Sequence, residues 1–233
     1  MKVSVILPTY NERENIKKLI GAILKAVKQP LEIIVVDDDS PDGTWEIVQG
    51  MSNKNKRIKL LRRTGERGLA ASIADGISMS KGGILVWMDC DFSHPPALIP
   101  KLIEGLENYD ISVASRYAMG GKDERKFFRA LMSRVINLFA NILLGFYVKD
   151  YTSGFIAIKR RVLGKAMFSR DGYGEYFIEL LYRSHKNGFK INEVPYVFKE
   201  RESGKSKTSM HAYSIFLHVI RYLTKVLKLK LNN

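Results

Sequence analysis

Short apolar runs and amphipathic segments alternate along the first half of the chain, and this alternation constrains the fold more than any other feature. Continuous apolar runs predict strands at residues 2–7, 31–37, 57–63, 83–89 and 110–115. Between them, apolar residues recur at helical spacing in residues 14–27, 42–51, 68–80 and 97–106. Apolar strands joined by helices form mostly parallel sheets that are covered on both faces. The sequence therefore predicts an α/β fold with a mostly parallel sheet flanked by helices.

Polar residues follow three of these strands, at the point where each strand ends. The motifs are PTYNE after Leu7, DDDSPDGT after Val36 and DCDFSH after Met88. In parallel α/β sheets, ligands bind beyond the carboxyl ends of the strands. We therefore expect the three motifs to converge on one site at that edge.

Asp89 and Asp91 place two like charges one residue apart at the end of a buried strand. Such carboxylates repel each other, which is unfavourable unless a cation lies between them. Mg²⁺ and Mn²⁺ take oxygen ligands, commonly one or two carboxylates together with phosphate and water. No glycine-rich phosphate loop follows the first strand, which argues against a dinucleotide dehydrogenase or a P-loop NTPase. The motif favours a nucleotide diphosphate that is bridged by a metal ion.

The run of three aspartates predicts a second group of ligands. Side chains alternate along a strand, so we expect Asp37 and Asp39 to face one way and Asp38 the other. The following SPDG predicts a tight turn into a helix. A helix cap followed by a solvated turn explains the same composition equally well.

The formal net charge of +14 indicates a negatively charged partner. Nucleic acid, an anionic membrane and phosphorylated small molecules all meet this requirement. The basic excess lies in the second half, with six basic against two acidic residues at 116–134 and eight against two at 195–233. No helix-turn-helix, zinc-finger or RNP-type signature accompanies it, so nucleic acid is not expected as a partner.

Cys90 is the single cysteine, which excludes an internal disulfide and indicates a reducing compartment. The apolar start of the chain is too short for a signal peptide. We therefore expect a cytoplasmic protein. For Cys90 a partly buried structural thiol is favoured over a redox switch, and for His94, which precedes two prolines, a structural role is favoured over metal binding.

Seven segments of the chain form a pattern: PTYNERENI, VVDDDSPDGT, GLAASIADGI, MDCDFSHPPALIPKLI, ASRYAMGG, DYTSGFIAIKRRVL and FKERESGKSK. In their order and spacing, from residue 3 to about 208, the chain resembles family 2 glycosyltransferases. The resemblance implies a GT-A type, Rossmann-like nucleotide-sugar domain. It also implies transfer of mannose from GDP-mannose to a dolichyl (polyprenyl) phosphate, with inversion at the sugar carbon and with Mg²⁺ or Mn²⁺ present. The alternatives are a glucosyl or other hexosyl transferase that uses a UDP-sugar, and a non-catalytic protein that binds nucleotide sugars or anionic membranes.

The resemblance assigns roles to residues of the first strand loops. Pro8, Tyr10 and Glu12 would surround the base and ribose, with Asp37 and Asp39 on the base side.

In the third loop, the resemblance places Asp89 by the ribose and diphosphate and gives Asp91 to the metal. Cys90 stands where many members carry alanine, and a backbone contact there would survive the change. Ser93 stands where many members carry a glutamine ligand, so the third metal ligand stays open between Ser93 and other groups.

Three basic residues are candidate phosphate clamps, because catalysis needs cations where negative charge accumulates on the leaving diphosphate. They are Arg116, Arg201 and Lys207, although without the resemblance a solvated basic turn is the favoured interpretation of residues 201–207. Glu179 stands where related transferases carry a base. A lipid phosphate is already anionic and needs none, so Glu179 is expected to orient the acceptor or the sugar, or to be a plain surface carboxylate.

Two amphipathic segments follow from the second half of the chain. Residues 129–141 carry a polar residue every four positions, and residues 221–228 carry a basic stripe beside an apolar face. The longest charge-free stretches of the chain, residues 135–148 and 208–220, are 14 and 13 residues long and fall short of the roughly 20 that a spanning helix needs. Such helices usually pack on a core, but the basic charge favours a membrane interface.

We therefore predict a catalytic domain at residues 1–208 and a basic amphipathic helix at residues 209–233. That helix is expected either to lie in the membrane interface or to pack on the domain. The protein is expected to bind the cytoplasmic face of the membrane peripherally, or through a separate membrane subunit.

Overall fold

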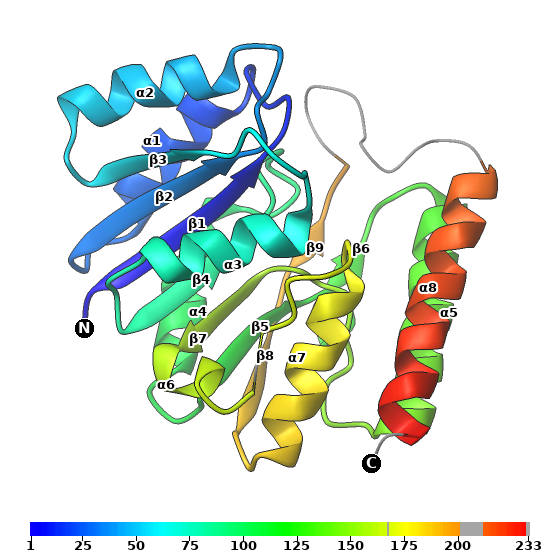
Figure 1. Cartoon of the computed structure of the whole chain (residues 1–233). Helices are drawn as coiled ribbons and strands as arrows, with labels where there is room; N and C mark the ends of the chain where they lie inside the picture. Colours follow the sequence, from blue (N-terminus) through cyan, green and yellow to red (C-terminus); the bar gives the residue numbers. More distant parts are fainter. Residues whose placement is uncertain (167, 201–211, 232–233) are drawn as a thin grey trace.

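A seven-stranded sheet forms the centre of the computed structural model, which describes residues 1–166, 168–200 and 212–231 (Figure 1). The strand order is β3-β2-β1-β4-β7-β5-β8. Neighbouring strands pair in parallel, except that β7 runs antiparallel to both β4 and β5. The predicted mostly parallel sheet is confirmed. The strands are β1 Val3–Thr9, β2 Leu31–Asp37, β3 Ile58–Arg62, β4 Ile84–Trp87, β5 Ile111–Ser115, β7 Ile156–Lys159 and β8 Ile191–Pro195.

Helices cover both faces of the sheet. One face carries α1 Ile16–Ala26, α2 Thr44–Lys54 and α4 Ile99–Gly105. The other carries α3 Leu69–Met79, α5 Phe127–Leu144, α7 Glu175–Lys186 and α8 Ala212–Leu231. Two short elements, η1 Pro96–Leu98 and α6 Arg160–Leu163, complete the helices of the described residues, and β6 Lys122–Asp123 pairs with β9 Val197–Phe198 in a separate parallel ribbon.

Strands β1, β2, β4, β5 and β7 are mostly apolar because each contributes buried residues to both cores. In β1, Val3, Val5 and Leu7 belong to the core beneath α1 and α4, whereas Ile6 belongs to the core beneath α3. Successive side chains of a strand point to opposite faces of the sheet, which explains this division. Burial on both faces fixes the register, so the polar residues that follow each strand are brought to one edge.

The helix α8 packs against α5 and α7 (Figure 1). Val226 is fully buried and Leu229 is 6% exposed, and both belong to the core that α5 and α7 share. The C-terminal helix was expected either to lie in the membrane interface or to pack on the domain. Val226 and Leu229 pack on the domain.

The helix α5 has its polar side against the protein and its apolar side exposed. Asn137 donates from Nδ2 to Thr152 Oγ1 at 2.8 Å, and its Oδ1 accepts the N–H of Tyr151 at 2.6 Å. Ser133 and Asn141 are also buried. Amphipathic helices of soluble domains usually bury their apolar side. In α5 only Ile136, Ala140 and Leu144 join the core, and most of the remaining apolar side chains are exposed, so the usual packing describes α5 only in part. Its exposed apolar side chains, which we call the α5 apolar face, are Phe127, Phe128, Leu131, Val135, Leu138 and Ile142.

Candidate active site

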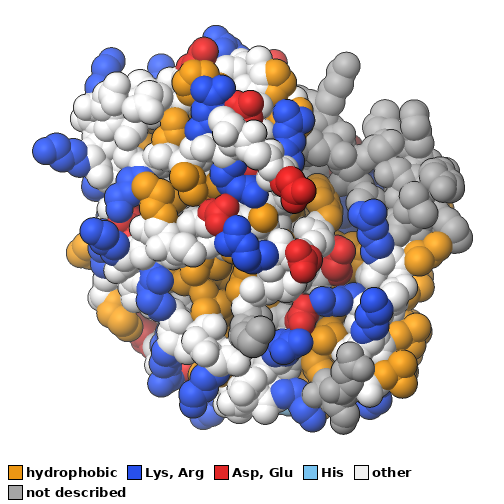
Figure 2. All heavy atoms as spheres, viewed as in Figure 1, with side chains coloured by type: hydrophobic (Ala, Val, Ile, Leu, Met, Phe, Trp, Pro, Cys, Tyr) orange, Lys and Arg blue, Asp and Glu red, His pale blue; other side chains and the backbone are white. Residues whose placement is uncertain are grey.

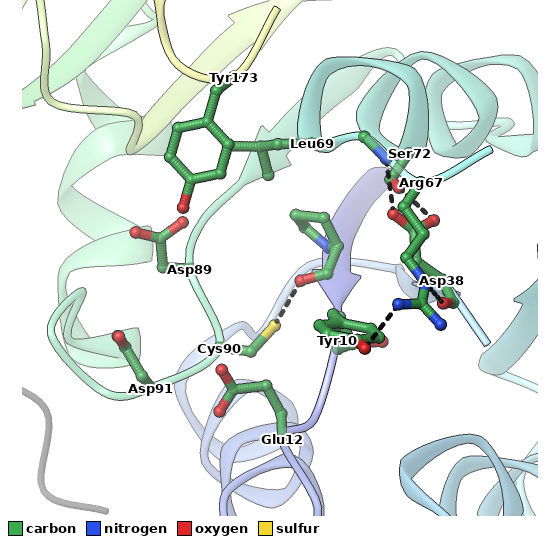
Figure 3. A pocket seen from close by; sticks show the side chains of 13 residues that line it. Tyr10, Glu12, Asp38, Arg67, Leu69, Ser72, Asp89, Cys90, Asp91 and Tyr173 are labelled. Carbon is green, nitrogen blue, oxygen red and sulfur yellow. Dashed lines mark hydrogen bonds between the residues drawn. The ribbon is translucent and has the colours of Figure 1, made fainter. Parts of the chain in front are cut away.

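A cavity of about 280 Å³ opens at the carboxyl ends of β1, β2 and β4, and we call it the first cavity (Figure 3). All three polar motifs line it, as the parallel sheet predicted. Their contributions are Pro8, Thr9, Tyr10 and Glu12 after β1, Asp38 after β2, and Asp89, Cys90 and Asp91 after β4.

Each of the three loops holds one non-glycine residue in the left-handed backbone region. Asn11, Asp39 and Phe92 have φ angles of 55°, 55° and 63°. Non-glycine residues rarely adopt such angles, and they persist where the surrounding structure holds them, often at functional sites. The three loops are therefore held in strained turns around the first cavity.

Asp38 is the aspartate of the DDD run that lines the first cavity. Its Oδ1 accepts from Arg63 at 2.5 Å and from Ser72 at 2.8 Å, and its Oδ2 accepts the N–H of Gly68 at 2.9 Å. The carboxylate thereby fixes the loop that precedes α3 along one wall of the cavity.

Asp37 and Asp39 do not line this cavity. Asp37 is fully buried and accepts bonds from Thr9 and Ser40, whereas Asp39 pairs with Arg62 at the surface. The expectation that Asp37 and Asp39 share the site is wrong for this cavity. The strand ends at Asp37, and the left-handed turn at Asp39 breaks the two-residue alternation on which that expectation rested.

Asp89 and Asp91 lie side by side along one wall (Figure 3). Asp91 is 7% exposed, and its Oδ1 accepts the hydroxyl and the N–H of Ser93 at 2.5 and 3.1 Å. Ser93 does not line the cavity, so its hydroxyl orients Asp91, contrary to its expected place among the metal ligands. Within the described residues no group of three acidic, histidine or cysteine side chains could hold a metal alone. Two carboxylates at a cavity fit an ion whose other ligands are phosphate and water.

Cys90 and His94 support this turn from inside the protein. The Cys90 thiol donates to the Pro8 carbonyl at 3.4 Å. His94 is fully buried, stacks on Phe155 and accepts the N–H of Asp89 at Nδ1, 3.0 Å away. Burial lowers the pKa of His94, which keeps Nδ1 available as an acceptor. Both side chains are buried and hydrogen-bonded, as structural roles require. Cys90 also lines the first cavity.

Arg67 and Tyr173 also line the first cavity, and sequence reasoning missed both. The Arg67 guanidinium lies 4.3 Å from the centre of the Tyr10 ring and donates to the Tyr10 hydroxyl at 2.6 Å. Both residues stand in short loops beside glycines, as in ERGL and DGYGE. That local pattern was the only signal that could have pointed to them.

A second cavity of about 180 Å³ lies among the end of β5, α5 and α8. Three guanidinium groups line part of it, and apolar side chains line the rest. The basic residues are Arg116, Arg125 and Arg129, and the apolar ones are Met132, Ile136, Val219 and the ring of Tyr222.

Arg116 lies at the second cavity and not at the first. It is 3% exposed and donates to both carboxylate oxygens of Asp150, at 2.8 and 2.6 Å. Burial alone would lower the pKa of Arg116, but the attraction and hydrogen bonds of Asp150 raise it above its ordinary value. Arg116 was expected to clamp the nucleotide phosphates, but it does not line the first cavity. It is a permanent cation in a buried ion pair with Asp150.

Glu179 lines neither cavity. It is 7% exposed and pairs with Arg183 one turn along α7, at 2.8 Å, and with Lys225 of α8. Glu179 therefore ties α7 to α8, and the expectation that it orients a substrate is wrong for this structure. The spacing of Glu179 and Arg183 is the signal of such a pair. Arg201 and Lys207 lie outside the described residues.

Comparison with curated proteins gives relatives that cover most of the chain. A dolichol-phosphate mannosyltransferase of Pyrococcus furiosus is 40% identical over 98% of this chain. The chain spans 64% of that relative's length, which is less than two thirds. A polyprenol monophosphomannose synthase of Mycolicibacterium smegmatis is 38% identical over 88% of this chain and 80% of its own.

Comparison with solved structures confirms the predicted GT-A type fold. Glucosyl-3-phosphoglycerate synthase from Mycobacterium tuberculosis, in complex with Mg²⁺ and UDP, matches 97% of this chain and 79% of its own with a TM-score of 0.73. The identity is 22%, so this likeness concerns the fold alone. The model of the family described as Glycosyl transferase family 2 matches residues 4–167, more than half of the sequence. With the relatives above, that match shows that the chain belongs to glycosyltransferase family 2.

Proposed function

We propose that the protein transfers mannose from GDP-mannose to a polyprenyl phosphate such as dolichyl phosphate. One observation carries the proposal: a carboxylate-lined cavity adjoins a second cavity that combines arginines with apolar walls, and Tyr173 lines both. A nucleotide diphosphate suits the first cavity, and a phosphate on a hydrocarbon chain suits the second. The names of the two curated relatives support the same donor sugar and the same class of acceptor.

The nucleotide sugar occupies the first cavity in this proposal. Pro8, Tyr10 and Glu12 surround the base and ribose, and Asp38 takes the base-side place that was expected for its neighbours. Asp89 and Asp91 would hold Mg²⁺ or Mn²⁺ together with the diphosphate. When bound, such an ion neutralises the negative charge that develops on the leaving diphosphate.

The acceptor phosphate occupies the second cavity beside Arg125 and Arg129. Guanidinium groups bind phosphate through charge-assisted hydrogen bonds, while Met132, Ile136 and Val219 provide an apolar wall for the first isoprene units. A phosphate oxygen attacks the anomeric carbon from the side opposite the nucleotide, and the bond from that carbon to the diphosphate oxygen breaks with its electron pair. The sugar is transferred with inversion, and no general base is required.

The α5 apolar face is proposed to lie on the membrane that holds the lipid. Figure 2 shows hydrophobic side chains along the right-hand edge of the molecule, over α8 and α5. By length and composition alone, Phe127–Leu144 could cross a membrane, although 33% of it is buried in the protein. Because the polar side of α5 is bonded to residues 151 and 152, we propose that this helix lies flat in the interface, where basic residues of α8 meet anionic lipid. We propose that the protein binds the cytoplasmic face of the membrane, because a chain with a single cysteine suits a reducing compartment.

The donor is tested by incubating the protein with Mn²⁺, a short polyprenyl phosphate and radiolabelled GDP-mannose, GDP-glucose, UDP-glucose or UDP-galactose. We expect label from GDP-mannose in the organic phase. Label from a UDP-sugar alone would replace this donor by the UDP alternative while leaving the acceptor site in place.

Changing Asp38 and its neighbour Asp39 separates the two sides of the DDD turn. Asp38→Ala is expected to weaken GDP binding about tenfold or more, because loss of a buried acceptor leaves its donors unsatisfied. Asp39→Ala is expected to change the affinity by less than about twofold, since its surface ion pair contributes little. Titration calorimetry with GDP and Mn²⁺ measures the affinity of each variant. An equal loss of affinity in the two variants would show that Asp39 also contributes to the nucleotide site.

A further inference from the structure

Tyr173 is the only residue of the described chain that lines both the first and the second cavity. Its side chain is the boundary that the two share. Figure 3 shows the ring standing at the edge of the first cavity with its hydroxyl directed toward Asp89. The residue is 38% exposed, so part of its surface is accessible to a ligand.

The loop that carries Tyr173 is held in place from both ends. Gly172 has a φ angle of 94°, which favours glycine, and a Cβ on Gly174 would overlap the hydroxyl of Tyr222 in α8. The N–H groups of Tyr173 and Gly174 both donate to the Glu175 carboxylate, at 3.1 and 3.0 Å. Gly172 and Gly174 allow this backbone conformation, and the close approach of Tyr222 restricts it. The conformation directs the Tyr173 ring between the cavities.

The chemistry of the proposed function makes that position consequential. The anomeric carbon is bonded to the diphosphate in the first cavity and must be reached by a phosphate oxygen from the second. Any water at the boundary competes for the same carbon. In that reaction the water oxygen bonds to the anomeric carbon, the bond to the diphosphate breaks, the diphosphate leaves with the electron pair and a proton passes to solvent.

We propose that Tyr173 is a catalytic residue that contacts the transferred sugar and closes the boundary between the cavities against water. Its hydroxyl can donate to Asp89 or to a sugar oxygen and accept a further bond, and its ring occupies the remaining space. Exclusion of water from such a site prevents hydrolysis of the donor. This inference rests on the proposed function.

The test measures transfer to lipid phosphate and release of free mannose from GDP-mannose in the same reaction. For Tyr173→Ala we expect transfer to fall about 100-fold, since small losses of positioning have effects of that size, and the ratio of hydrolysis to transfer to rise at least tenfold. Tyr173→Phe keeps the ring and should lose about tenfold in transfer, the size of one hydrogen bond, with a ratio near that of the wild type. Tyr109→Ala, which removes a tyrosine of similar exposure, 39%, from a distant loop, is the matched control.

An unchanged ratio in Tyr173→Ala, with transfer and hydrolysis lowered equally, would overturn the inference and leave the proposed function standing. If the wild-type protein itself transfers no mannose to any lipid phosphate, the proposed function fails, and the inference fails with it. Because the ratio is taken within one sample, partial loss of folded protein does not change it. The phenylalanine variant separates loss of the ring from loss of the hydroxyl.

Discussion

Asp91→Ala is expected to abolish mannose transfer, with a loss on the order of 10³-fold, the size seen when a group that stabilises charge in the transition state is removed. Asp91 is nearly buried and is oriented by two hydrogen bonds from Ser93. Without Asp91, one fewer carboxylate holds the metal ion that balances the negative charge of the nucleotide diphosphate. Nucleotide binding should also lose its dependence on Mn²⁺. Initial rates and calorimetric titrations with and without Mn²⁺ measure the two effects.

A matched control removes a carboxylate from an exposed site. Glu104 lies on the surface of α4, and Glu104→Ala is expected to change transfer by less than about twofold. Asp91→Asn keeps the shape of the side chain without its charge, and should be almost as inactive as the alanine variant. Near-normal turnover in Asp91→Ala with Mn²⁺ present would show that the metal lies elsewhere.

The double substitution Leu138→Glu and Ile142→Glu is expected to release the protein from anionic liposomes. The two side chains are 57% and 63% exposed on the α5 apolar face. Burying one Leu or Ile side chain contributes about 1.5–3 kcal/mol, so losing both should reduce membrane partitioning by more than about 100-fold. Transfer to a long-chain lipid phosphate in liposomes should fall accordingly. Liposome sedimentation and transfer assays give the two readouts.

The control for this pair adds the same charge to a polar helix. Gln49 and Asn53 are exposed on α2, and replacing both with glutamate makes an equal change in net charge far from α5. We expect that variant to bind liposomes as the wild type does. Transfer to a short, water-soluble acceptor should be similar in all three proteins. If Leu138→Glu with Ile142→Glu leaves liposome binding intact, α5 is not the membrane contact.

The sheet and the position of the site could be predicted from the sequence because both follow from local patterns. Continuous apolar runs require burial on two faces, and this requirement predicted strands β1 to β5. In a parallel sheet, the polar residues that follow β1, β2 and β4 then lie at one edge. Strand β7, the IAIK segment at Ile156–Lys159, escaped the prediction. It is a short strand that lies antiparallel between β4 and β5. It is not part of the regular strand–helix alternation from which strands β1 to β5 were predicted.

Interactions between distant segments account for the errors at α5 and Glu179. A repeat of polar residues defines two faces of α5, but it cannot say which face meets the protein. That choice depends on Tyr151 and Thr152, which offer hydrogen-bond partners to Asn137. Glu179 was expected at the substrates from the family resemblance, but its partner Lys225 lies in another helix, and no local pattern indicates that ion pair.

The central claim is that this chain joins a nucleotide-linked mannose to a lipid phosphate, and one measurement addresses it directly. Purified protein is incubated with GDP-mannose, Mn²⁺ and either a short polyprenyl phosphate or the corresponding polyprenol, and the lipid fraction is analysed by mass spectrometry. We predict a lipid heavier by one hexose residue from the phosphate and no product from the alcohol. Nucleotide binding without a hexosylated lipid from GDP-mannose or from any other nucleotide sugar would contradict the account and favour a non-catalytic binding protein.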